Sequence, residues 1–217
     1  MNFKKLYDFL RDLQKNNHKD WMDANRNRYE NVRDDFISWL DAMNLKLASL
    51  DPEYYDTPGK KAINRINNNL MFHPNKPTYK DHFGAGLDQE HKQGDFYIHL
   101  GVNGSFIGGG YWHPLAPFLK SIREAIDYNG EVLKGILDRK SFQDRFGNMI
   151  EGEALKKAPK GYSQDHRHID LLRRKTFAVS WDVSEQEVIS EGFDEEVLKV
   201  YVDMLPFRRY LNKAVSV

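Results

Sequence analysis

The sequence predicts an α+β protein with a helical N-terminal part, a central antiparallel or mixed sheet, and helices packed on that sheet. Apolar residues recur at helical spacing over residues 3–47, alternate at strand spacing over 96–102, and return to helical spacing after 114. Apolar residues make up 40% of the 217 residues and aromatic residues 13%, enough for a packed core. No repeat or linker interrupts the chain, so we expect a single domain over residues 1–217.

The N-terminal part predicts two helices and a loop. Asn2 is expected to cap a helix that ends before Asn16-Asn17, and Asp20 begins a longer helix that continues to about residue 47. Residues 61–66 predict a strand. Residues 67–80 are rich in Asn and Pro and have no period, which is typical of a long ordered loop, and such loops often carry function.

A β-hairpin is predicted at about residues 95–110. Apolar residues alternate there with Tyr97, His99 and Gly101, and Asn103-Gly104 predicts a two-residue type I′ turn. Glycines at 108–110 interrupt the return strand, where we expect a bulge or a close backbone approach.

The remaining chain predicts helices and one more strand. We expect helices over 114–128, 132–137 and 165–174, and a strand over 175–183. Ser184 and Glu187 have the spacing of a capping box, and a last helix over 194–212 contains Pro206.

Charges balance overall but not locally. Lys+Arg and Asp+Glu are 32 each, which excludes the strongly basic composition of a dedicated nucleic-acid-binding domain. Residues 60–80 hold five basic side chains and no acid, and residues 156–175 hold seven basic and two acidic side chains. Residues 182–203 hold eight acidic side chains and one basic side chain.

Several classes of protein are excluded. The chain has no Cys, hence no disulfide, no thiolate nucleophile and no cysteine-ligated metal. The histidines are dispersed without a His-Glu-x-x-His pattern, and neither a P-loop nor a Rossmann fingerprint occurs, so we expect no metal and no cofactor. A charged start and the lack of a long apolar run predict a cytoplasmic protein without membrane contact.

Short motifs in order along the chain carry a resemblance to a known family. They include Arg65-Ile66-Asn67, the segment Lys76-Pro77-Thr78-Tyr79-Lys80, the segment His82-Phe83-Gly84-Ala85, and Gly108-Gly109-Gly110-Tyr111. This pattern resembles domain-of-unknown-function family 2461, a bacterial family of conserved hypothetical proteins. The resemblance covers almost the whole chain and implies its fold, but it supplies no function.

This member departs from the family pattern in one segment. The family places Arg-Asp-x-Arg before the Phe, whereas this chain has Asn68-Asn69-Leu70-Met71 there. If the family uses that Asp as an acid or base, this chain lacks it, because an amide does not exchange a proton at ordinary pH. The Asn side chains can still position a ligand by hydrogen bonds.

The leading functional hypothesis is a site for a small anionic or phosphorylated ligand between the 65–80 loop and the hairpin. Cationic side chains would bind the anion, amide and phenol groups would donate hydrogen bonds, and glycine would give access to the backbone. The ligand-binding candidates are Arg65, Asn68, Lys76, Tyr79, Lys80, His82, His99 and Gly109. No catalytic residue is assigned, and whether the chain catalyses a reaction stays open.

Two alternatives remain open. The chain would bind nucleic acid if the 60–80 and 156–175 basic windows met on one surface with aromatic residues between them. It would be a protein-interaction module, without a small-molecule ligand, if the acidic stretch 182–203 paired with a basic partner. The sequence does not determine the oligomeric state.

Overall fold

The structure is a computed structural model that describes residues 1–90 and 94–215. In chain order the elements are α1 (Phe3–Lys15), α2 (Lys19–Ala24), α3 (Arg26–Leu50), α4 (Gly59–Ala62), β1 (His82–Leu87), β2 (Phe96–Gly101), β3 (Ser105–Tyr111), α5 (Ala116–Leu137), α6 (Lys140–Phe146), α7 (Ile169–Leu172), β4 (Phe177–Val183), α8 (Glu185–Ile189) and α9 (Phe193–Val215). The strands form one antiparallel sheet in the order β1-β2-β3-β4. The α+β prediction is confirmed, with the hairpin at β2–β3.

The chain divides into two compact units. The first comprises Met1–Gln89, Tyr97–Ile107 and Asp182–Leu198, and the second comprises Glu90–Phe96, Gly108–Trp181 and Lys199–Val217. Strands β2, β3 and β4 each contribute residues to both units. The expectation of a single domain stays a prediction.

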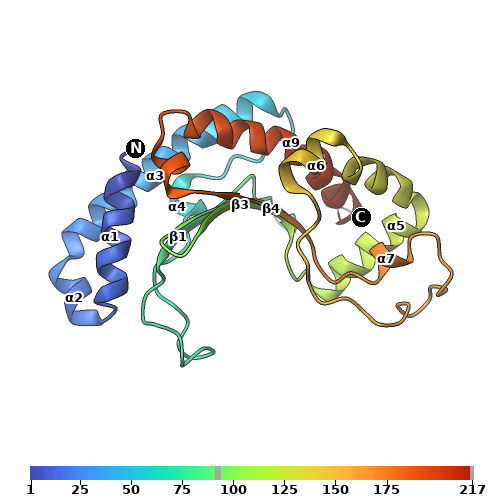
Figure 1. Cartoon of the computed structure of the whole chain (residues 1–217), viewed down its shortest axis with the longest axis horizontal. Helices are drawn as coiled ribbons and strands as arrows, with labels where there is room; N and C mark the ends of the chain where they lie inside the picture. The colour runs from blue at the N-terminus through green and yellow to red at the C-terminus, as the bar shows by residue number, and fades with distance from the viewer. Residues whose placement is uncertain (91–93, 216–217) are drawn as a thin grey trace. The chain divides into compact units, whose positions relative to one another are not determined.

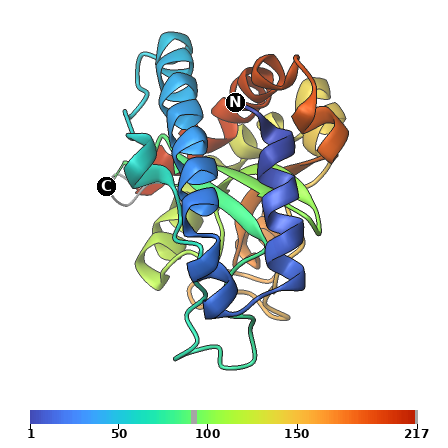
Figure 2. The ribbon, with the colours of Figure 1, turned by 90° about the vertical axis from the view of Figure 1, so that its left-hand side faces the viewer.

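In the first unit, α1 and α3 lie side by side and cover one face of the sheet (Figures 1 and 2). Asn2 accepts a hydrogen bond from the Lys5 backbone N–H, as expected of an N-cap. The rings of Phe9 and Phe36 lie 6.5 Å and 5.6 Å from the ring of Phe83 on β1. Burial of these apolar side chains holds the helices to the sheet.

In the second unit, α9 supplies much of the core. Tyr201 meets Phe96 edge to face at 5.1 Å, and Phe207 lies 5.7 Å from Phe142 of α6. Arg208 is 1% exposed and donates to the carbonyl of Gly94 at 2.9 Å. Helix α9 runs through Pro206 without ending, although proline removes one helical hydrogen bond.

Three local predictions were wrong or incomplete. Residues 61–66 do not form a strand: α4 occupies residues 59–62, and only Ile63 forms an isolated bridge, to Ala85. Strand β1 was not predicted. The long N-terminal helix is divided at Asn25 into α2 and α3.

The hairpin turn also differs from the prediction. Residues 102–104 separate β2 from β3, and only Gly104 has a positive φ, of 139°, so the turn is not type I′. The Gly101 backbone N–H donates to the Ser105 hydroxyl at 3.0 Å, and the Val102 N–H donates to the Asp81 carbonyl. Strand β2 ends at Gly101, one residue short of the predicted turn at Asn103-Gly104.

Candidate functional site

The 67–80 loop is an ordered segment held at its base. Asn67 bridges Tyr79, and the Lys80 N–H donates to the Ile66 carbonyl at 2.8 Å. Asn17, which follows α1, binds both backbone groups of Tyr79: its amide donates to the carbonyl at 2.9 Å and its oxygen accepts from the N–H at 2.8 Å. The Tyr79 side chain is 5% exposed and therefore anchors the loop.

Asn68 stabilises the loop from within. Its side-chain amide donates to the Pro77 carbonyl at 2.8 Å, and its backbone N–H donates to the Thr78 carbonyl. Beyond Asn68 the loop extends away from the helices of its unit (Figure 1). Its tip is apolar and open to solvent, with Met71 84% and Phe72 71% exposed.

Three cationic side chains, Arg65, Lys76 and Lys80, gather at this loop. The Lys80 ammonium donates to the Arg65 carbonyl at 2.5 Å. Burial lowers the pKa of Lys80, and the charges of Arg65 and Lys76 lower it further. Among the residues that the structure describes, none of the three forms an ion pair with a carboxylate. The cluster therefore carries positive charge that no acidic side chain of the described residues neutralises by an ion pair.

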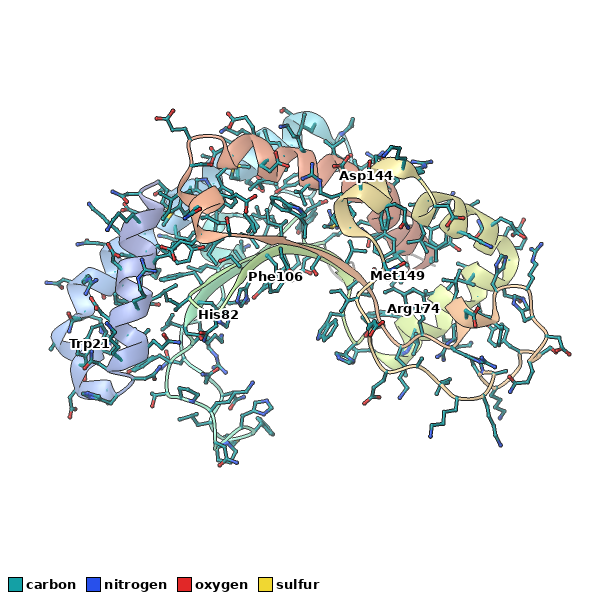
Figure 3. The ribbon with its side chains drawn as sticks, viewed as in Figure 1. Trp21, His82, Phe106, Asp144, Met149 and Arg174 are labelled. Atoms are coloured by element: carbon teal, nitrogen blue, oxygen red, sulfur yellow. The ribbon has the colours of Figure 1, made fainter. Side chains whose placement is uncertain are left out.

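Next to this cluster, three rings form a row across β1, β2 and β3. The rings of His82 and His99 stack at 4.0 Å, and the rings of His99 and Phe106 stack at 4.6 Å with an interplanar angle of 13°. His82 and Phe106 lie on the sheet face turned away from α1 and α3 (Figure 3). We call His82, His99 and Phe106 the ring row. All three side chains are half-buried.

The surroundings of both histidines of the ring row favour the neutral imidazole. Burial lowers the pKa of His82, and the charges of Lys80 and Lys76 add to this effect while Asp81 opposes it. Burial, with a contribution from His82, lowers the pKa of His99 to about 4. A neutral His82 donates its Nδ1–H to Asp81 at 3.2 Å, because a carboxylate can only accept.

A pocket of about 560 Å³ adjoins the ring row. Its lining residues are Asp81, His99, Gly101, Asn103, Gly104, Ser105, Phe106, Asp182, Val183 and Ser184, all in the first unit. Burial would raise the pKa of Asp81, but its hydrogen bonds with His82 and Asn103 outweigh burial and lower it. The pocket thus combines aromatic, carboxylate and hydroxyl groups.

Gly109 lies in the second unit, and its surroundings there are closely packed. A Cβ on Gly109 would lie 2.5 Å from the Met204 sulfur and 2.9 Å from the Asp95 carbonyl oxygen. The expected close backbone approach is confirmed, although β3 continues through residues 108–110 without interruption. A ligand role for Gly109 stays a prediction.

The 156–175 basic window has several of its cations engaged. Lys175 pairs with Glu153 at 2.8 Å and Arg167 with Glu131 at 2.5 Å. Arg174 donates to the Ile150 carbonyl at 2.6 Å. This window therefore offers fewer free cations than its composition indicates.

Seven of the eight ligand-binding candidates lie in the first unit, and their role stays a prediction. Sequence reasoning placed a pocket between the 65–80 loop and the hairpin, but it did not include Asp81, Phe106 and Asp182 among the ligand-binding candidates. The alternation of β2 placed Tyr97, His99 and Gly101 on one face, and extending the same face to the partner strand leads to Phe106. No sequence signal relates Asp182, on β4, to this pocket.

Two further findings concern the described residues only. They contain no group of three or more His, Asp or Glu side chains that could hold a metal ion. None of the helices found there has the length and apolar character needed to cross a membrane.

These features define an α+β protein with an unneutralised cation cluster beside a half-buried ring row. The family model for conserved hypothetical proteins (DUF2461) matches residues 5–210, so the chain belongs to this family, whose function is unknown. No curated protein and no solved structure matches the chain.

Proposed function

We propose that this protein binds a small anionic ligand, such as a phosphorylated metabolite, at the cluster of Arg65, Lys76 and Lys80. The ligand's anion would accept hydrogen bonds from the two lysines and the guanidinium, which suit a phosphate or carboxylate. We assign no reaction. A cytoplasmic location is part of the proposal and agrees with a chain that has no cysteine.

The main observation in support of this proposal is the environment of Lys80. Its ammonium is half-buried beside two other cations, with no carboxylate partner among the described residues. Holding like charges together in a partly desolvated place costs free energy that a bound anion recovers. Of the candidate residues, Asn68 and Tyr79 would support this site by holding the loop, since their polar backbone and amide groups are already engaged.

The site is tested by thermal unfolding with Lys80→Met, which keeps the apolar stem and removes the charge. Lys134→Met is the matched control, because Lys134 is an exposed lysine of α5. The probes are inorganic phosphate, sulfate, small organic phosphates and dicarboxylates. A ligand at about 100 times its Kd stabilises by about 2.7 kcal/mol, which raises Tm by roughly 5–10 °C for a chain of this size.

We expect at least one anion to raise the Tm of the wild-type protein and of Lys134→Met, and to leave Lys80→Met unchanged. A flat response of all three proteins to every anion would overturn the proposal and favour a protein partner. An equal rise in all three would place the anion elsewhere and overturn it as well.

The nucleic-acid alternative uses the same cluster together with the 156–175 window. The ion pairs of Lys175 and Arg167 count against it, because those cations are already neutralised. The protein-interaction alternative depends on the acidic stretch 182–203. Its Glu185 pairs with Arg11 at 2.7 Å and its Asp194 pairs with Lys46 at 2.7 Å, so part of that charge is satisfied within the first unit.

A further inference from the structure

Two polar side chains that line the pocket beside the ring row have no hydrogen-bond partner within the part of the chain that the structure describes. Most of its lining groups are engaged: the Ser105 hydroxyl with Tyr7 at 2.7 Å and with the Gly101 N–H, and the Ser184 hydroxyl with Glu187. The Asn103 side chain is shared between Asp81 and Gln14. Among the described interactions, the His99 imidazole and the Asp182 carboxylate form no hydrogen bond.

His99 is held so that one ring nitrogen lies over the pocket lining. Its Nε2 is 3.1 Å from the position that a Cβ of Gly101 would occupy, and the Cβ of His82 is 2.8 Å from that position. A side chain at residue 101 would collide with the Cβ of His82 and would lie tightly against the His99 ring. Glycine at residue 101 therefore leaves room for Nε2 beside a residue that lines the same pocket as His99.

The His99 imidazole and the Asp182 carboxylate determine which ligand groups can form hydrogen bonds in the pocket. A carboxylate such as Asp182 only accepts hydrogen bonds, and a neutral imidazole accepts at one nitrogen and donates at the other. A complementary ligand therefore presents mainly donors, such as hydroxyl groups. An anionic group would be repelled by Asp182 and Asp81, so the pocket and the cation cluster select different parts of a ligand.

The pocket and the cation cluster adjoin each other. Lys80, Asp81 and His82 are consecutive: Lys80 belongs to the cluster, Asp81 lines the pocket, and His82 belongs to the ring row. The charges of Lys80 and Lys76 act on the His82 imidazole, which stacks on His99. The cluster, the ring row and the pocket are therefore connected through the three consecutive residues 80–82.

We propose that the ligand is a phosphorylated sugar, whose phosphate binds Arg65, Lys76 and Lys80 and whose hydroxyl groups donate to Asp182 and His99. The non-polar C–H face of the sugar would lie against Phe106. This inference rests on the proposed function, since it assigns the anionic group to the same cluster.

The ring row leaves the His99 imidazole no free face on which an aromatic base could stack. Both faces of the His99 imidazole are covered, by His82 at 4.0 Å and by Phe106 at 4.6 Å. A base would have to stack on Phe106 instead, and the titration with adenosine monophosphate tests this. Sugar hydroxyls need only the ring nitrogen and the carboxylate at the edge of the row.

Isothermal titration calorimetry separates the contribution of the phosphate group to binding from the contribution of the sugar. The probes are inorganic phosphate, glucose 6-phosphate, ribose 5-phosphate, free glucose and adenosine monophosphate. The variants are Asp182→Asn, His99→Gln and, as the matched control, Asp165→Asn, an exposed aspartate in the second unit. Circular dichroism and Tm confirm that each variant is folded before titration.

We expect a sugar phosphate to bind at least 10-fold tighter than inorganic phosphate to the wild type and to Asp165→Asn. Asp182→Asn and His99→Gln should each lose most of that gain and keep the affinity for inorganic phosphate. Equal affinities for phosphate and both sugar phosphates would overturn the sugar inference but leave the anion site intact. An unchanged gain in Asp182→Asn would also overturn it.

Two other outcomes separate the remaining possibilities. Tighter binding of adenosine monophosphate, with ribose 5-phosphate no better than phosphate, would overturn the sugar assignment and indicate recognition of the base. No binding of any phosphate would overturn this inference, and the proposed function would fall with it only if sulfate and the dicarboxylates also left the Tm of the wild type unchanged.

Discussion

At the scale of single residues, the imidazole of His99 links the pocket to stability. Burial lowers its pKa to about 4, whereas an unfolded chain has a histidine pKa near 6.5. Between these values the unfolded chain binds a proton that the folded protein does not. The free energy of unfolding should therefore be highest above about pH 6.5 and fall as pH decreases towards 4.

We expect His99 to account for a loss on the order of 1 kcal/mol between pH 7.5 and 5, after allowance for solvent screening of a half-buried ring. Urea unfolding at the two pH values measures it, with His99→Gln as the variant that cannot titrate. The pKa of His82 is lowered too, so part of the pH dependence should remain in the variant. An identical pH dependence in both proteins would contradict the assignment to His99.

Alanine substitutions at two glycines of the second unit should change the free energy of unfolding in opposite directions. Gly109→Ala places a methyl group 2.5 Å from the Met204 sulfur, and we expect a loss of about 1–3 kcal/mol from overpacking. Gly135 lies in α5 with nothing within 4 Å of its Cβ position, so Gly135→Ala should stabilise by up to about 1 kcal/mol. Chemical denaturation of the wild type and the two variants measures both changes in the free energy of unfolding. If Gly109→Ala is neutral, the packing interpretation is wrong.

At the scale of elements, Asn17 connects the end of α1 to the candidate loop. It satisfies both backbone groups of Tyr79, so Asn17→Ala leaves two buried polar groups without their partner and should cost about 1–3 kcal/mol. Limited proteolysis should then cut the 67–80 loop faster than in the wild type. Phe72→Ser, at the exposed tip, should change stability by less than about 0.5 kcal/mol. Equal cleavage rates in the wild type and Asn17→Ala would show that the hydrogen bonds between Asn17 and the Tyr79 backbone do not hold the loop.

The elements that sequence predicted well are those with a strong period. The alternation of β2 and the capping box at Ser184 are both present, and the helical spacing of α1 agrees with its bounds. Strand β1 escaped prediction because Gly84, Ala85 and Gly86 have low strand propensity. Tyr97 of the neighbouring strand covers Gly84: its hydroxyl lies 2.2 Å from the position of a Cβ there, so tertiary packing favours glycine.

The candidate site was predictable only in part. The charge window gave Arg65, Lys76 and Lys80, and the strand period gave His99, since both signals are local in sequence. Asp182 lies more than 80 residues after His99, and only the sheet order brings β4 into the same pocket lining. Asn17 was missed for the same reason: its bonds to Tyr79 join segments that no local pattern relates.

At the scale of the whole molecule, charge balance limits what the cation cluster can do. Lys+Arg equals Asp+Glu at 32, and several cations of the 156–175 window are paired within the second unit. A protein that binds nucleic acid through many phosphates needs far more unpaired positive charge. The three cations at the loop suffice for one phosphate group.

Because the cluster has only three cations, we expect a weak salt dependence for any binding of this protein to single-stranded oligonucleotides. Three phosphate contacts give a slope of about −2 in log affinity against log salt, hence a loss of roughly 20-fold between 50 and 200 mM. Fluorescence anisotropy of a labelled oligonucleotide measures it, with Lys80→Met expected to reduce the slope and Lys160→Met to leave it unchanged. A loss of 1,000-fold or more, reduced by both variants, would mean that both basic windows bind phosphates. Nucleic acid would then replace the small anion as the ligand of this protein.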